Sequence, residues 1–144
     1  MGIKIIEAQA ARNFGTKEKC KEYRHRLSGK IHLVIGNHDY KNKIHTLGNL
    51  FTEISPLITI NHQKHRIILC HYAMRTWDAS HYNSYQLYGH SHGMLDGIGK
   101  QMDVGVDTHP EFRPYSFDEI AKIMKTKTIA QVDGHKQGAD DKIS

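Results

Sequence analysis

Long apolar runs are missing from this chain of 144 residues, of which 38% are hydrophobic and 24% charged. The longest apolar stretches contain only a few residues, far fewer than the roughly 20 that a membrane-spanning helix needs. The first residues also lack the charged-then-apolar pattern of a secretory signal. We therefore predict one cytoplasmic globular domain with no membrane partner.

Cysteine is scarce as well. Cys20 and Cys70 are the only two cysteines, and they form no C-x-x-C pair. This pattern is typical of two reduced thiols in an intracellular protein.

Aspartate is absent from the first 38 residues, where the only carboxylates belong to Glu7, Glu18 and Glu22. The first aspartate is Asp39. A site that needs an aspartate upstream of residue 39 therefore cannot be built from this chain.

Histidine, in contrast, is abundant, with twelve residues, and the formal net charge is +5. A basic surface favours anionic partners such as phosphate esters. Nucleic acid is not the partner that we predict, because the lysines and arginines are scattered and form no basic cluster with interleaved aromatic residues. Histidine is the commonest metal-ligating side chain, so its placement needs closer inspection.

The pattern of apolar residues predicts short strands that alternate with a few helices. This alternation favours a mixed α/β fold over residues 1–125, followed by a polar tail at 126–144. Thr16 is a candidate N-cap for the first helix, and Ser116 with Glu119 fits a capping box for the last. The expected helices cover residues 17–27, 44–51 and 116–125, and the expected strands cover 3–6, 31–35, 57–60, 66–70, 85–88 and 100–106.

Polar motifs follow three of these strands, at Gly36–Asp39 (Gly-Asn-His-Asp), at His71 and at Gly89–His92 (Gly-His-Ser-His). Loops that leave strand ends often carry functional side chains. In the first motif, Asn37 offers an amide oxygen to a divalent cation. His38 is suited to protonating a leaving oxygen, and Asp39 to orienting that imidazole. The alternative is an ordinary polar turn.

The later histidines carry a similar ambiguity. His90 and His92 form an H-x-H pair, which is a recognised metal-ligand spacing. His71 gives the weakest signal alone, because a single histidine after a strand is commonly just a hydrogen-bonded polar residue.

The ordered combination of the three motifs indicates a protein family more specifically than any single motif does. Gly-Asn-His-Asp, then a strand ending in His71, then Gly-His-Ser-His, in that order, resembles the calcineurin-like metallophosphoesterase superfamily. Three later segments resemble the closing strand and helix of its compact bacterial and phage branch: Met102–Asp107, Arg113-Pro114 and 116–120. The resemblance covers about residues 15–125.

This resemblance implies a β-sandwich flanked by helices and the hydrolysis of phosphate mono- or diesters, nucleotides among them. It also implies two divalent ions, manganese first, with iron, zinc, nickel or magnesium as alternatives. By this analogy Asn37, His71 and His90 would hold one ion and His92 would serve the other. His38, backed by Asp39, would face the phosphate.

The chain departs from the family pattern before residue 36. An Asp-x-His and a Gly-Asp motif, whose aspartate bridges the two ions, have no counterpart, and Glu7 is the only candidate by position. We therefore expect an N-terminally incomplete or degenerate member that holds one ion or none. The alternative is a non-catalytic remnant that binds one metal or a protein partner, with self-association through an exposed sheet edge.

Two further segments invite functional interpretation. Asp107-Thr108-His109 is an Asp-x-His, but it follows Gly-His-Ser-His, so we expect a loop carboxylate and a surface histidine. In the irregular segment 72–83, Trp77 or Tyr82 could stack on a base, or the loop could be packed by its own aromatic residues.

Overall fold

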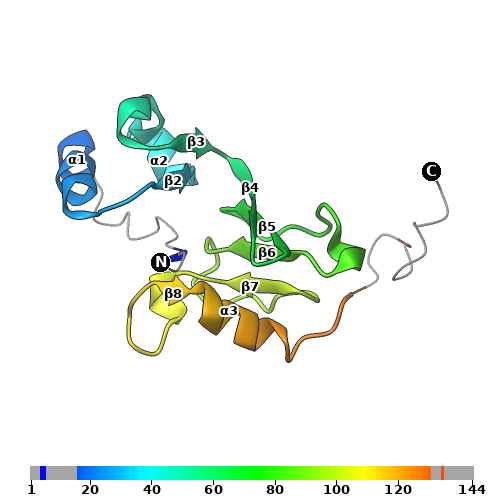
Figure 1. The fold of residues 1–144 in the computed structure, drawn as a ribbon. Helices are drawn as coiled ribbons and strands as arrows, with labels where there is room; N and C mark the ends of the chain where they lie inside the picture. The colour runs from blue at the N-terminus through cyan, green and yellow to red at the C-terminus, as the bar shows by residue number, and fades with distance from the viewer. Residues whose placement is uncertain (1–3, 6–15, 131–133, 135–144) are drawn as a thin grey trace.

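The structure, a computed structural model, describes residues 4–5, 16–130 and 134. Among these residues two groups of elements lie side by side. One group contains α1, α2, β2 and β3, and the other is a four-stranded sheet with α3 beside it (Figure 1). The chain passes from the first group to the second where β3 leads into β4.

In the first group, α1 (Lys17–Arg26) begins at Thr16, whose hydroxyl accepts a hydrogen bond from the Lys19 backbone N–H at 3.3 Å. The short strands β2 (His32–Val34) and β3 (Glu53–Ser55) pair in parallel. They are connected by α2 (Asn37–Lys41) and two 3-10 turns, η2 (Ile44–Thr46) and η3 (Gly48–Leu50). Four side chains form the core of this group: Cys20, Leu33, Ile44 and Leu47.

The four-stranded sheet has the order β4-β5-β6-β7, with bounds Leu57–His62, His65–Cys70, Tyr85–Tyr88 and Gln101–Asp103. Strands β4 and β5 form an antiparallel hairpin, whereas β5, β6 and β7 run in parallel. All four residues of β6 are buried, as expected for a central parallel strand covered on both faces.

Helix α3 (Phe117–Met124) supplies Phe117, Ile120 and Met124 to the main core, where they pack with residues of β5, β6 and β7. Its N-terminus carries a complete capping box, in which Ser116 and Glu119 satisfy each other's backbone N–H groups. Strand β8 (Tyr115–Ser116) precedes the helix and pairs antiparallel with β1 (Lys4–Ile5).

Most expected elements are present, and the mixed α/β class is confirmed. The helix expected over 44–51 is wrong, because this segment forms two 3-10 turns. The strand expected over 100–106 covers only 101–103. Both strands of the hairpin are longer than the expected 57–60 and 66–70, so only Gln63 and Lys64, both with positive φ, form the turn. The two-sheet sandwich stays a prediction, and most of the tail lies outside the described residues.

None of the helices in the described ranges combines the length and apolar character needed to cross a bilayer.

Ile120 is fully buried between α3 and the sheet, so replacing it with alanine removes core contacts. We expect Ile120→Ala to lower the free energy of unfolding by about 2–5 kcal/mol. Lys122→Ala, on the exposed side of the same helix, should change it by less than about 0.5 kcal/mol. Denaturant unfolding measures both, and equal effects would contradict the packing of α3.

Candidate functional site

The three motifs come together where three strands end. Gly36–Asp39 follows β2, His71 follows β5, and Gly89–His92 follows β6. Because β5 and β6 are parallel neighbours, their carboxyl ends present His71 and His90 together. The backbone links them further, since the carbonyl oxygen of His71 accepts hydrogen bonds from the N–H groups of Gly89 and His90, at 3.2 and 3.0 Å.

Three side-chain atoms from these segments converge. The Nε2 atom of His71 lies 2.9 Å from Oδ1 of Asn37 and 3.0 Å from Nδ1 of His90. A ring nitrogen carries either one proton or one lone pair. His71 Nε2 therefore cannot make a good hydrogen bond to both neighbours at once.

The convergence fits a shared cation. Donor atoms bound at about 2.1 Å to one ion, at angles of about 90–110°, lie about 3.0–3.4 Å apart. The two distances around His71 Nε2 are close to this range. In the described residues, no group of three or more His, Cys, Asp or Glu side chains is arranged for a metal. The cluster at His71 differs because its third donor is the amide oxygen of Asn37.

Gly36 makes room for this imidazole. A Cβ atom at Gly36 would lie 2.9 Å from Cε1 and Nδ1 of the His71 ring. His71 is only 4% exposed, so the ring has little space to retreat. Glycine is thus required here because of close packing, not because of backbone conformation.

Two further imidazoles lie within electrostatic range. The pKa of His90 is lowered by partial desolvation first, and then by His71, His92 and His38. Protonation of any of these three histidines therefore opposes protonation of His90. His38 itself is exposed at the start of α2, open to an incoming ligand.

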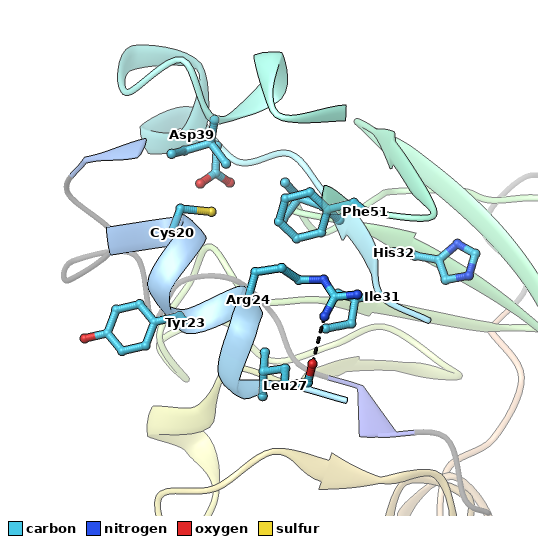
Figure 2. Close-up of a pocket in the computed structure, with 10 residues that line it drawn as sticks. Cys20, Tyr23, Arg24, Leu27, Ile31, His32, Asp39 and Phe51 are labelled. Atoms are coloured by element: carbon cyan, nitrogen blue, oxygen red, sulfur yellow. Dashed lines mark hydrogen bonds between the residues drawn. The ribbon is translucent and has the colours of Figure 1, made fainter. Parts of the chain in front are cut away.

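Asp39 is buried, at 4% exposure, and accepts a hydrogen bond from the Gly36 backbone N–H at 2.9 Å. Burial raises the pKa of its carboxyl, while this hydrogen bond and the charges of His71 and His38 oppose that rise. In Figure 2 its carboxylate points toward Cys20, into an apolar pocket between α1 and β2. Asp39 thus fixes the turn that carries Asn37, and its expected role behind His38 stays a prediction.

His92 stands apart from the three converging donors and pairs with Asp107. Its Nδ1 atom lies 2.5 Å from Oδ2 of Asp107. His92 has a φ of 49°, a left-handed conformation that costs energy for a non-glycine residue. The following residue, Gly93, is held by its N–H to Oδ2 of Asp103 at 2.9 Å.

Asp107 is therefore a partner of a candidate site residue, and sequence reasoning undervalued it. It belongs to the late Asp-x-His, and its proximity to His92 depends on how the loop after β7 folds back. The expectation that His109 is a surface histidine is wrong. His109 is 6% exposed, lies 3.4 Å from Oε1 of Glu119 and packs against Tyr115.

The three aromatic residues Tyr72, Trp77 and Tyr82 of the 72–83 segment lie in three different environments. Trp77 is 8% exposed and donates its indole N–H to the Ser84 carbonyl, so it packs the loop and does not stack on a ligand. Tyr82 lines a groove with Lys64 and Asn83, near the amino ends of β5 and β6. Tyr72, which the sequence did not single out, lies 4.8 Å from the ring centroids of both His71 and His90.

Comparison with known proteins adds a fold and no function. No family model matches the chain, and no curated protein matches it. The crystal structure of a protein of unknown function from Aquifex aeolicus is similar, with a TM-score of 0.54 and 24% identity. The similarity covers 74% of this chain and 67% of that one, and shows that the α/β arrangement has a counterpart among solved structures.

The packing of Gly36 against His71 can be tested by adding one methyl group. Gly36→Ala should lower the free energy of unfolding by about 1–3 kcal/mol, because the methyl group overlaps the imidazole. Gly48→Ala is the matched control, since a Cβ atom there meets nothing within 4 Å. Thermal and denaturant unfolding measure the difference, and equal stability of the two variants would contradict the close approach.

Thiol reactivity tests the packing of α1 over Asp39. Burial raises the pKa of Cys20, and the nearby Asp39 charge adds to this, so little thiolate forms at pH 8. We expect iodoacetamide to modify the less buried Cys70 faster than Cys20 in the native protein. Mass spectrometry of the two peptides gives the rates. In guanidinium the two rates should become similar, and similar rates without denaturant would disprove the burial of Cys20.

Proposed function

We propose that this chain is a metal-dependent phosphoesterase of the calcineurin-like type, acting on phosphate mono- or diesters. The observation that carries the proposal is that His71 Nε2 contacts both Asn37 Oδ1 and His90 Nδ1, which brings three separate segments together. These are the residues that the family resemblance implies as ligands of one ion. The two-sheet sandwich of the family belongs to the same proposal.

The donor set suits a borderline divalent cation. An amide oxygen and two neutral imidazoles can bind manganese, iron, zinc or nickel, and manganese is the ion that we propose first. When bound, such an ion supplies Lewis-acid polarisation of a phosphoryl oxygen. Three uncharged ligands would leave the charge of such an ion uncompensated, which would favour an anionic phosphate ester as the ligand of this site.

The protein's own groups supply proton transfer and orientation. His38 is exposed beside the cluster, where its imidazole can donate a proton to the leaving oxygen of the ester. Asp39 holds the turn that positions it through the hydrogen bond to Gly36. Asp107 fixes the ring orientation of His92, the residue that the family resemblance assigns to the other ion.

A second candidate function is a non-catalytic remnant that binds one ion or a protein partner. The observation that favours it is the position of the upstream carboxylates in the described part of the chain. Glu18 and Glu22 are exposed on α1 and lie outside the cluster, so they offer no bridging carboxylate. Within the described ranges β2 and β3 pair only with each other, and an outer edge of this pair would then be the place where a second copy adds a strand.

Metal analysis and turnover of bis(p-nitrophenyl) phosphate with Mn²⁺ separate the two functions. Two ions per chain with turnover support the enzyme, one ion or none without turnover supports the remnant, and turnover without any bound ion contradicts both.

Within an active protein, His38→Ala should reduce turnover by about 10²–10⁴-fold with unchanged manganese content, because His38 is assigned proton transfer and not ligation. His71→Ala should lose the ion itself. His45→Ala, an exposed imidazole of η2 outside the cluster, is the control and should behave as wild type. Loss of manganese in His38→Ala would contradict the assigned roles.

A further inference from the structure

Tyr72 occupies a distinctive place beside the histidine cluster. Its ring centroid lies 4.8 Å from those of both His71 and His90, at interplanar angles of 76° and 53°. The contact with two imidazoles fixes one flank of the ring. Even so, Tyr72 is 48% exposed, so a large part of the phenol remains open to solvent.

The backbone around Tyr72 is held in place by two buried amides. Gln86 donates to the Tyr72 carbonyl oxygen at 3.4 Å and accepts from the Met74 N–H at 3.2 Å. Gln101 donates to the Met74 carbonyl oxygen at 2.8 Å. Gln86 and Gln101 belong to β6 and β7 and are essentially inaccessible to solvent. The exposed ring is therefore presented from a backbone that two sheet strands hold.

A fixed, half-exposed aromatic ring next to a phosphate-binding cluster has a clear chemical use. Planar bases stack on aromatic side chains, largely independently of base identity. A nucleoside phosphate joins a planar base to a phosphate through one sugar, so the groups that bind them must be near neighbours. Tyr72 meets this requirement. Trp77 is buried, and Tyr82 lies at the amino ends of the strands.

We propose that Tyr72 is the platform for the base of a nucleoside phosphate ester, and hence that nucleoside phosphates are the substrate class of this site. This inference rests on the proposed phosphoesterase function. It assigns specificity to a residue outside the ligand and proton-transfer set, and it predicts tolerance of different bases, because stacking requires only a planar face.

The kinetic test compares two diesters with the same leaving group, thymidine 5′-(p-nitrophenyl phosphate) and methyl p-nitrophenyl phosphate, in the presence of Mn²⁺. The wild-type protein should show a kcat/KM about tenfold higher for the nucleoside ester, equivalent to about 1.4 kcal/mol. Tyr72→Leu should abolish most of this preference, whereas Tyr72→Phe should keep it because the ring remains.

Tyr82→Leu is the matched control. Tyr82 is 43% exposed, similar to Tyr72, but it lies in the groove near the amino ends of the strands. Its replacement should leave the ratio of the two kcat/KM values unchanged. A ratio that is equally high in wild type and Tyr72→Leu would overturn the inference, as would a ratio near one in wild type. Because the readout is a ratio, a general loss of activity in Tyr72→Leu does not obscure it.

Binding separates this inference from the proposed function and needs no variant. AMP and ribose 5-phosphate carry the same phosphate and differ by the base. AMP should bind about tenfold more tightly and shift the ring signals of Tyr72 in NMR spectra, while ribose 5-phosphate should not shift them. Such binding without any turnover would support the platform and contradict the enzyme. Turnover with equal binding of the two ligands would support the enzyme and overturn the platform.

Discussion

The imidazole of His71 lies where three loops meet, and the candidate site depends on its position. The Nε2 atom of this ring contacts Asn37 and His90, and the ring fills the space left by Gly36. The backbone carbonyl oxygen of His71 accepts hydrogen bonds from two backbone N–H groups of the loop after β6. A residue so placed serves both structure and chemistry. Strand β5 fixes the backbone position of His71, and contacts with the two flanking loops fix the orientation of its ring.

The local elements and the ligand-type residues of this site could be predicted from the sequence. The capping signals at Thr16 and Ser116 and the apolar strands reflect interactions between residues near each other in the chain, which a pattern can reveal. The motif order also identified Asn37, His71 and His90, which the structure brings together. The helix predicted over 44–51 was wrong because the apolar residues of this segment suit either a helix or two 3-10 turns packed on a core.

The remaining site features depend on contacts that no local pattern encodes. Asp107 reaches His92 across 15 residues only because the loop after β7 folds back. His109 is buried because Tyr115 and Glu119 surround it, and neither is predictable as its neighbour. Tyr72 and Trp77 have similar aromatic character in the sequence. Tertiary packing alone leaves the first exposed and buries the second.

The carboxylates near the site are engaged in shaping loops. Asp39 binds the backbone N–H of Gly36, Asp103 binds those of Gly93 and Gly105, and Asp107 pairs with His92. The side chains that meet at His71 Nε2 are therefore an amide and an imidazole, with no carboxylate, so an anionic ligand would be needed to balance a cation held there. The chemistry that we propose for the site, binding of a phosphate ester, supplies that anion.

The three donors come from segments separated by 34 and 19 residues. An ion held by all three would therefore act as a cross-link, closing two loops and joining the group of elements around α1 to the four-stranded sheet. Closing such loops removes conformational freedom from the unfolded chain, and binding to the folded state alone shifts the folding equilibrium. Metal supply would then control how firmly the two halves of the fold hold together, as well as what the site can bind.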